Sequence, residues 1–181
     1  MSDNLREELI SSKIVFSGRL LKIRVDGVRL PDGHESVREV IVHPGAVAMV
    51  PLLDDRHVLL VRQWRHAAGT ALLEIPAGTL DPGEDPKACA ERELMEEVGY
   101  RPGKLTSLYA TNLAPGYSSE KLNVFLAEEL TPEKLAHDED ERLEVVSLSW
   151  DEIDEMLLRC EFSDSKTFGA LLFVQKLLKQ R

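Results

Sequence analysis

Residues 78 to 100 read GTLDPGEDPKACAERELMEEVGY and carry the clearest local signals in the chain. Asp85 followed by Pro86 is a favourable N-cap and first-turn pair, and Gly99 is a favourable left-handed stop. The stretch therefore predicts a loop over 78–84 followed by a helix over 86–98.

The predicted helix has one apolar face and one acidic face. At 100° per residue, four apolar side chains lie on or beside one face: Ala90, Leu94, Met95 and Val98. Three carboxylates form an arc on the neighbouring side: Glu93, Glu96 and Glu97. Like charges three or four residues apart cost about 0.2–0.5 kcal/mol per pair, so the arc weakens the helix unless a cation bridges it.

The acidic arc is either a solvated surface or a site for a divalent cation. Charged residues on a Glu-rich helix are mostly exposed, which favours the first reading. Mg²⁺ or Mn²⁺ would suit the second, because these ions prefer carboxylate, water and phosphate oxygens as ligands.

The spacing of the stretch favours the cation site. It matches the Nudix box: a glycine, five residues, a glutamate, seven residues, then Arg-Glu-apolar-any-Glu-Glu-any-Gly-apolar. Tyr100 is the one departure, since an aliphatic residue is usual there. The chain thus resembles the Nudix hydrolases. This resemblance implies an α/β fold with an α+β mixed sheet, the Nudix αβα sandwich, with an N-terminal antiparallel β-sheet appendage.

Length and composition limit the remaining classes. A chain of 181 residues is enough for one full domain with a small appendage. The net charge of −10 and the pI near 5.0 argue against binding to a nucleic-acid backbone. Cys89 and Cys160 are too few for a disulfide framework, no apolar run approaches a membrane span, and the N-terminus lacks a signal sequence. A cytoplasmic protein without a membrane partner is expected.

The N-terminal part predicts a small sheet. Residues 1–13 are polar and indicate a loose arm, whereas 14–42 show short β-type runs separated by turn residues. Such a sheet is too small to bury both faces, so it must lie on the rest of the chain or on a second copy. We therefore expect an arm and appendage over 1–44 and the main domain over 45–181.

The main domain predicts alternating strands and helices. Strands are expected at 46–53, 58–64, 71–76, 105–111, 121–126 and 143–148, and helices at 151–158 and 167–178. The first two strands flank a short turn and are predicted to be neighbours in a mixed, buried sheet. In the last helix we expect a buried stripe of Phe168, Leu171, Leu172 and Val174.

Two features resemble one branch of the family, the ADP-ribose pyrophosphatases. The run LLEIPAG occupies 72–78, and Pro115 lies fifteen residues beyond the end of the box. This resemblance implies Mg²⁺-dependent hydrolysis of ADP-ribose to AMP and ribose 5-phosphate, with Mn²⁺ able to substitute. It also implies a homodimer whose N-terminal sheets are exchanged between subunits.

The same resemblance assigns the reacting groups. The metal ligands would be Glu93, Glu97, Glu141 and the carbonyl oxygen of Ala77, while Glu96 completes or orients the set. Glu139, in the acidic run before the strand at 143–148, would be the general base.

Substrate contacts are implied in the same way. They would come from Arg65, from Arg38 of a neighbouring subunit, from Glu120 near the terminal ribose and from Thr79. Arg92 lies four residues before Glu96, so it is either an intrahelical charge partner or a substrate contact.

Three other functions stay open at this point. The substrate could be another nucleoside diphosphate derivative, such as a nucleotide sugar, NADH or FAD, since base selection depends on pocket shape. A nucleotide-sensing module without turnover would be marked by lost box carboxylates, and none is lost. An acidic metal-binding scaffold would not explain the spacing of Gly78, Glu84 and Gly99.

Overall fold

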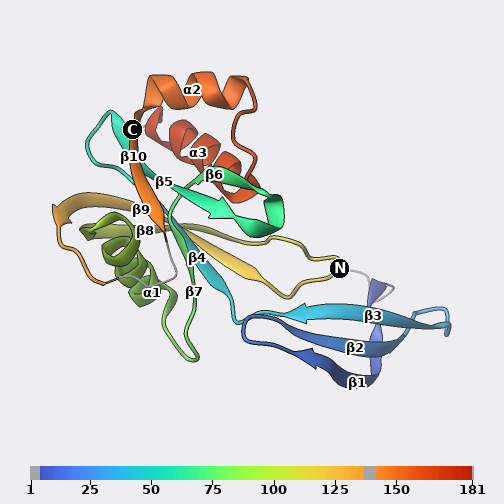
Figure 1. Cartoon of the computed structure of the whole chain (residues 1–181). Helices are drawn as coiled ribbons and strands as arrows, with labels where there is room; N and C mark the ends of the chain where they lie inside the picture. Colours follow the sequence, from blue (N-terminus) through green and yellow to red (C-terminus); the bar gives the residue numbers. More distant parts are fainter. Residues whose placement is uncertain (1–4, 137–141, 181) are drawn as a thin grey trace. The chain divides into compact units, whose positions relative to one another are not determined.

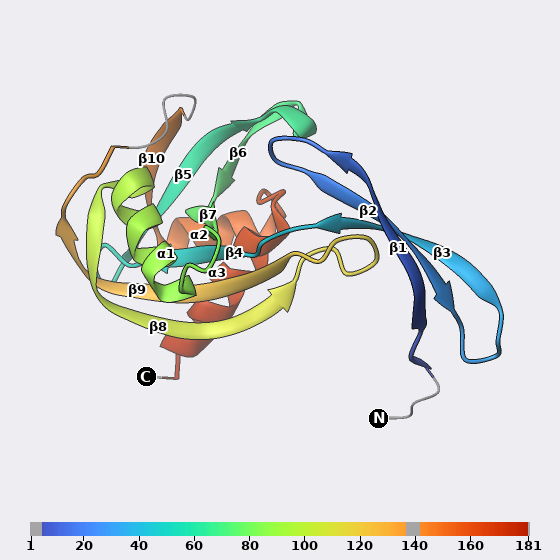
Figure 2. The same cartoon turned by 90° about the horizontal axis from the view of Figure 1, so that it is seen from below.

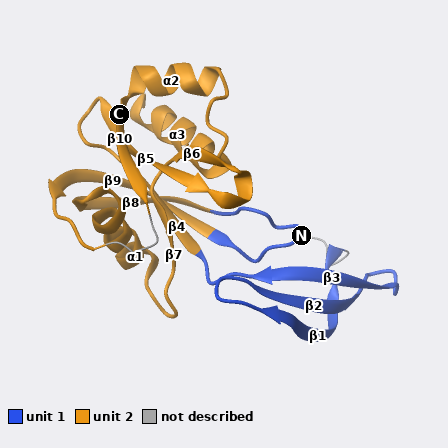
Figure 3. Cartoon of the chain, in the orientation of Figure 1, with its two compact units in different colours: residues 1–45, 111–121 blue, residues 46–110, 122–181 orange. Residues whose placement is uncertain are grey.

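A computed structural model describes residues 5–136 and 142–180 of the chain. The chain forms two compact units, coloured separately in Figure 3. Unit 1 consists of Met1–Gly45 and Thr111–Lys121, and unit 2 of Ala46–Ala110 and Leu122–Arg181. The first division falls beside the sequence boundary at residue 44, and unit 1 also takes in a later loop.

Unit 1 is built on a three-stranded antiparallel sheet in the order β1-β2-β3 (Figure 1). The strands are β1 (Glu8–Ser17), β2 (Lys22–Arg29) and β3 (Glu35–Val42). The expectation of a loose arm over 1–13 was wrong for residues 8–13, which belong to β1. Their polar sequence is compatible with a strand because the backbone pairs with β2 while the side chains stay exposed.

Strand β1 leaves much apolar surface uncovered. All ten of its residues are exposed, including five apolar ones: Leu9, Ile10, Ile14, Val15 and Phe16. Inside the sheet, Val28 and Asp26 are buried, and Asp26 accepts a hydrogen bond of 2.6 Å from Ser12 Oγ. A small sheet of this kind gains little stability until its apolar surface is covered.

The loop Thr111–Lys121 belongs to unit 1 because it bonds to the end of β3. Ile41 N donates to the carbonyl oxygen of Tyr117 at 2.8 Å, and Ile41 O accepts from Ser119 N at 3.0 Å. His43 N donates to Ser119 Oγ at 2.9 Å. The turn-rich segment predicted between two strands is therefore fixed by backbone pairing.

Unit 2 contains a mixed sheet in the order β7-β4-β9-β8. Its strands are β4 (Ala46–Pro51), β7 (Ala77–Thr79), β8 (Tyr100–Asn112) and β9 (Lys121–Pro132). β4 pairs in parallel with β9 and antiparallel with β7. β8 and β9 are longer than the sequence predicts, because both strands continue through residues without an apolar pattern.

A second sheet of unit 2 has the order β10-β5-β6 and is antiparallel. Its strands are β5 (His57–Arg65), β6 (Thr70–Glu74) and β10 (Leu143–Ser149), with a short 3-10 helix, η2 (His66–Ala68), between β5 and β6. The prediction that β4 and β5 are neighbours in one sheet was wrong. Both edges of β4 are taken by β7 and β9, which leaves a single bridge from Leu52 to Val58.

Helices cover the sheets of unit 2. α1 (Pro86–Glu93) and α3 (Ser165–Leu178) both contact β4, whose six residues are all buried, and α2 (Trp150–Leu158) packs on α3 and β10. Figures 1 and 2 show α1 on one side of the strands and α2 and α3 on the other. The predicted α/β fold class, with a mixed sheet and an N-terminal antiparallel sheet, is confirmed.

The core beneath α1 joins both sheets. It contains Val47 and Met49 of β4, Leu59 and Val61 of β5, and Leu94 from the predicted helix. Because successive strand residues face opposite sides, the other residues of β4 point towards α3. The helix at 86–98 is therefore anchored on two strands at once.

The predicted stripe of helix α3 is confirmed for Leu171 and Val174 and wrong for Leu172, while Phe168 is only partly buried. Thr167, Ala170, Leu171 and Val174 are buried, whereas Leu172 is 42% exposed. Phe173 makes an edge-on contact with Tyr109, with ring centroids 5.3 Å apart. No helix within residues 5–136 and 142–180 is both long and apolar enough to cross a membrane.

Candidate active site

The box helix begins and ends where the sequence predicts. The Asp85 carboxylate accepts hydrogen bonds from Lys87 N at 3.0 Å and Ala88 N at 3.3 Å, and Gly99 ends the helix with φ 76°. Residues 94–98 form a π-helical turn, η3 (Leu94–Val98), where the sequence predicts α-helix throughout. Single π turns within helices are frequent at functional sites, because they re-aim the side chains that follow.

The apolar face of this helix packs as predicted. Five of its residues are buried: Cys89, Ala90, Leu94, Met95 and Val98. Glu97, assigned to the acidic side, is also buried, with 8% of its surface exposed. A carboxylate in such a place needs polar partners, since an unpaired buried charge is strongly unfavourable.

Gly78 is required because Glu93 lies against it. A Cβ on residue 78 would stand 1.9 Å from Glu93 Cδ and 2.1 Å from Glu93 Oε1. The missing side chain thus lets the Glu93 carboxylate reach the backbone of β7. This close approach explains why the box begins with glycine.

Glu97 reaches the adjacent residue of the same strand. Its Oε2 accepts a hydrogen bond of 3.0 Å from Ala77 N. Glu93 and Glu97, one helical turn apart, therefore bring their carboxylates to two consecutive residues of β7. The arrangement concentrates oxygen donors beside the backbone whose carbonyl, at Ala77, was assigned as a ligand.

Arg92 is the cation that bridges the acidic arc in this structure. Its Nε and Nη2 hold both oxygens of Glu84, at 3.0 and 3.1 Å. Its Nη1 lies 2.8 Å from Glu93 Oε1 and 2.9 Å from Glu96 Oε2. Arg92 is therefore a charge partner of Glu96, which was one of the two predicted alternatives. It also pairs with Glu84 and Glu93, which the helical spacing did not indicate.

The network around Arg92 shifts the titration of its neighbours. Hydrogen bonds from Arg92, with a further one from Asp81 N, hold the pKa of Glu84 at about 2. Burial first, and then the hydrogen bond with Glu84, raises the pKa of the Cys89 thiol to about 12. Cys89 is thus a neutral packing group at physiological pH and cannot act as a thiolate nucleophile.

The residues near β7 suit a hard divalent cation. Within residues 5–136 and 142–180, no group of three His, Cys, Asp or Glu side chains lies in an arrangement that would hold a metal ion by itself. The assigned ligand set accordingly includes a backbone carbonyl, that of Ala77, beside its carboxylates. Two carboxylates converging on Ala77 and Gly78 fit an ion such as Mg²⁺, which binds few protein oxygens and keeps waters and phosphate oxygens as its other ligands.

The assigned base and the third metal-binding carboxylate, Glu139 and Glu141, lie outside the described residues. Both belong to the acidic run before β10. Their roles stay predictions from the resemblance.

Arg65 is held by a buried carboxylate that the sequence analysis missed. Arg65 Nε donates to Glu74 Oε2 at 2.6 Å, and Lys166 Nζ lies 2.8 Å from Glu74 Oε1. The Glu74 side chain is 3% exposed and that of Arg65 is 40% exposed. The available signal was a single charged residue within the apolar run LLEIP.

The backbone from Glu74 to Gly78, called the 74–78 segment below, is fixed at each residue. After Glu74, Ile75 N donates to Thr167 Oγ1 at 2.9 Å, and Pro76 O accepts from Met49 N at 2.9 Å. Ala77 and Gly78 then meet the two box glutamates. The segment connects helix α3 to the box helix within unit 2.

The other assigned substrate contacts are distributed over both units. Thr79 is exposed at the end of β7, and its carbonyl oxygen lies 3.6 Å from Cys89 Sγ. Arg38 and Glu120 belong to unit 1, where Arg38 Nε donates to Glu7 at 3.1 Å and Glu120 N donates to Ser118 Oγ at 3.1 Å.

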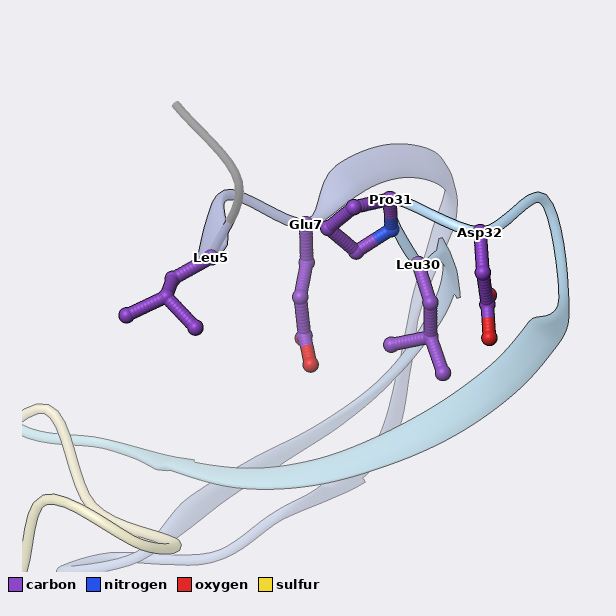
Figure 4. A pocket seen from close by; sticks show the side chains of 5 residues that line it. All are labelled: Leu5, Glu7, Leu30, Pro31 and Asp32. Atoms are coloured by element: carbon purple, nitrogen blue, oxygen red, sulfur yellow. The ribbon is translucent and has the colours of Figure 1, made fainter. Parts of the chain in front are cut away.

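A hollow of about 420 Å³ lies in unit 1. It is lined by Leu5, Glu7, Leu30, Pro31 and Asp32 (Figure 4). None of the assigned site residues lines it, so it contributes nothing to the assignment.

Comparisons with known proteins identify relatives of the chain. Residues 42–172 match the model described as NUDIX domain, and residues 7–41 match the nucleoside diphosphate sugar hydrolase N-terminal domain. The ADP-ribose pyrophosphatase of Bacillus subtilis strain 168 is 40% identical over 174 residues, covering 95% of this chain and 94% of the relative. The methanol dehydrogenase activator of Bacillus methanolicus is 36% identical over 177 residues, covering 97% of this chain and 96% of that protein.

A solved structure is similar over nearly the whole chain. A crystal structure of an ADP compounds hydrolase matches with a TM-score of 0.88 at 32% identity, over 99% of this chain and 98% of that chain. The NUDIX model covers more than half of the sequence, and Gly78 and Glu93, both residues of the box, lie in close contact. The chain therefore belongs to the Nudix family and is a Nudix hydrolase.

Proposed function

We propose that this Nudix hydrolase cleaves the pyrophosphate bond of ADP-ribose to give AMP and ribose 5-phosphate, with Mg²⁺ as cofactor and Mn²⁺ able to substitute. The convergence of Glu93 and Glu97 on Ala77 and Gly78 carries the proposal, because oxygen donors so placed suit a pyrophosphate-binding cation. The choice of ADP-ribose rests on the name of the Bacillus subtilis relative.

Four groups would hold the cation in this proposal. They are Glu93, Glu97, the carbonyl oxygen of Ala77 and, from the acidic run, Glu141. When bound, the ion supplies charge neutralisation at the pyrophosphate and makes the attacking water more acidic. Glu96, held by Arg92 at 2.9 Å, keeps a further carboxylate oriented beside the set.

The remaining groups would move the proton and bind the substrate. Glu139 accepts the proton of the attacking water as general base. Arg65 offers its exposed guanidinium to a phosphate group, which a planar fork of donors binds well. Thr79 is the second residue of the box and ends β7, and Glu120 binds near the terminal ribose.

A homodimer is part of the proposal. The five exposed apolar residues of β1 support it, because a second copy would cover them. Arg38 would then serve the site of the other subunit. Docking of the small sheet within its own chain is the competing arrangement, and the oligomeric state distinguishes the two.

We also expect a cytoplasmic location. Cys89 and Cys160 are both free thiols, and Cys160 is exposed. Exposed free thiols are typical of reducing compartments. Fractionation of cells that produce the protein should place it with cytosolic markers.

A second candidate is another nucleoside diphosphate derivative as substrate. The match of residues 7–41 to a nucleoside diphosphate sugar hydrolase domain favours a nucleotide sugar among these. A module that only senses nucleotides has no such support, because every box carboxylate is present.

A substrate screen tests the proposal. Purified protein with Mg²⁺ would be given ADP-ribose, GDP-mannose, NADH and FAD, with products identified by mass spectrometry. We expect the highest kcat/KM for ADP-ribose, and one labelled product when the reaction runs in ¹⁸O-water. If ADP-ribose stays intact while GDP-mannose or FAD is cleaved, the substrate is wrong although the hydrolase assignment stands.

A further inference from the structure

Four side chains of unit 2 form a line of alternating charge that ends at Arg65. Asp164 Oδ2 lies 2.9 Å from Lys166 Nζ, which lies 2.8 Å from Glu74 Oε1, and Glu74 Oε2 accepts from Arg65 Nε at 2.6 Å. The side chains of Asp164, Lys166 and Glu74 are 15%, 12% and 3% exposed, whereas that of Arg65 is 40% exposed. The line thus ends in a guanidinium at the surface.

Lys166 determines how Glu74 can bind Arg65. A carboxylate that faces a lone guanidinium tends to take two parallel hydrogen bonds from it. Here one oxygen of Glu74 is occupied by Lys166, so Arg65 is bound through Nε alone. Within residues 5–136 and 142–180, Glu74 is the one hydrogen-bond partner of the Arg65 guanidinium, which leaves the edge formed by Nη1 and Nη2 for an anion.

The charges are also arranged so that the positive charge of Arg65 is not fully neutralised by Glu74. Without Lys166, Arg65 alone would balance the negative charge of the buried Glu74. Lys166 neutralises part of the Glu74 charge. Asp164 is itself stabilised at the start of helix α3, where Thr167 N and Oγ1 donate to its Oδ2. An anion at Arg65 therefore meets less repulsion from the buried carboxylate.

We propose that Glu74 and Lys166 are positioning residues, which hold Arg65 by one edge so that its other edge receives a phosphate group of the substrate. This inference rests on the proposed contact between Arg65 and the pyrophosphate. Neither residue touches substrate. Lys166 acts through Glu74, and Glu74 acts through Arg65.

The same helix also supports the metal-binding end of the site. Thr167, next to Lys166, accepts a hydrogen bond from Ile75 N, two residues before Ala77. Helix α3 therefore fixes both Arg65 and the 74–78 segment. A phosphate bound by Arg65 and a cation bound near Ala77 would be held to one common frame.

The test is a kinetic double-mutant cycle on the full chain, with ADP-ribose and Mg²⁺. Lys166→Met keeps the length of the side chain but removes its charge, and we expect KM to rise about tenfold with kcat within about twofold of wild type, the pattern of a lost binding contact. Lys166→Arg should restore KM. Lys176→Met, an exposed lysine on the same helix, is the matched control and should leave both constants unchanged.

Coupling to Arg65 separates positioning from a general structural role. In an Arg65→Ala background, which itself raises KM, Lys166→Met should cause no further rise, and Glu74→Gln should behave in the same way. An equal rise in both backgrounds, or a fall in melting temperature with KM unchanged, would overturn the inference. Should Lys166→Met fail to fold, Lys166→Gln replaces it in the cycle under the same criteria.

The two proposals fail in different ways. Wild-type protein that does not hydrolyse ADP-ribose contradicts the proposed function, and the cycle is then run with the substrate that is cleaved. Wild-type KM in Arg65→Ala shows that Arg65 does not bind substrate, which removes the basis for positioning. If KM is raised in Arg65→Ala but unchanged in Lys166→Met, the positioning role is contradicted and the proposed function stands.

Discussion

Gly78 and Glu93 are in such close contact that a methyl group on residue 78 would overlap the Glu93 carboxyl carbon. The overlapped atoms are the end of a flexible side chain, so Glu93 can move aside with little loss of stability. We therefore expect Gly78→Ala to fold with nearly unchanged stability and to lose about 100-fold or more in kcat, because a displaced ligand disturbs the reacting geometry.

The matched control for this change is Gly169→Ala on helix α3. A Cβ there would meet nothing closer than Tyr109 Oη at 4.0 Å. This variant should gain about 0.5–1 kcal/mol in stability, because alanine is the better helix former, and should keep full activity. Equal activity in Gly78→Ala and wild type would contradict the role given to the contact.

Removing the charge of either box ligand should abolish most turnover. Glu93→Gln and Glu97→Gln each keep an oxygen acceptor while an anionic ligand is lost, and in Glu97→Gln the bond from Ala77 N can persist. We expect kcat to fall by orders of magnitude with circular dichroism unchanged. Glu91→Gln, on the same helix, is the control, and near-wild-type turnover in either test variant would refute the metal assignment.

Replacing the bridging arginine should make the protein depend on added cation. Arg92→Met removes the partner shared by Glu84, Glu93 and Glu96, and we expect a loss of about 2–3 kcal/mol in the metal-free protein. Because three partly buried carboxylates then repel one another, Mg²⁺ should raise the melting temperature more in this variant than in wild type.

The exposed pair of Arg101 and Glu133 supplies the control for that experiment. Arg101→Met should change stability far less than Arg92→Met does, because an exposed ion pair contributes little, and it should not alter the response to Mg²⁺. A response to Mg²⁺ in Arg92→Met no larger than in wild type would mean that the arginine does not offset repulsion in the arc.

Acid should weaken the line of charges that starts at Asp164. Burial alone would raise the pKa of the Asp164 carboxyl, but the charge of Lys166 and the hydrogen bonds from Thr167 bring it below the usual 3.8. A carboxyl with a lower pKa in the folded state stabilises the protein above its unfolded pKa, and this contribution is lost as the pH falls from there through the folded pKa.

Urea unfolding of wild type and Asp164→Asn between about pH 6 and about pH 3 measures this contribution. Asparagine is an equally good N-cap, so the helix start is preserved in the variant. The free energy of unfolding of wild type should fall more steeply with acid than that of the variant. Parallel curves would show that Asp164 has the same pKa in both states.

Complementation tests the proposed dimer. Glu97→Gln lacks a metal ligand, and Arg38→Ala lacks the contact proposed to act on the other subunit, so each protein should be nearly inactive alone. Mixing them should restore part of the activity, because a heterodimer can hold one site with both groups intact. Heterodimers confirmed by tagged pull-down but without activity, or an active monomer in ultracentrifugation, would contradict the arrangement.

Local sequence signals predicted the box helix correctly. The wrong predictions concern contacts between residues distant in sequence, which leave no local signal. Asp85, Pro86 and Gly99 determine its start and end through contacts within a few residues, so the span 86–98 was predicted correctly. The pairing of β4 with β5 was wrong, because adjacency along the chain does not reveal that β9 and β7 take both edges of β4.

Contacts in the site between residues distant in sequence were equally impossible to predict from the sequence. Glu74 and Lys166 are 92 positions apart, and no periodicity connects them. Helical spacing predicted the ion pair of Arg92 with Glu96, but the ion pair of Arg92 with Glu84 depends on the path of the loop before the helix. The assigned roles of the ligands and substrate contacts still rest on the resemblance and await the experiments above.

The 74–78 segment has a consequence for insertions and deletions. The contacts of the segment follow one another residue by residue, so one added or lost residue would move every later group away from its partner. Ile75, Pro76 and Ala77 take part through backbone atoms, which most side chains share. The number of residues between Glu74 and Gly78 should therefore tolerate no change, while the middle positions accept varied apolar side chains.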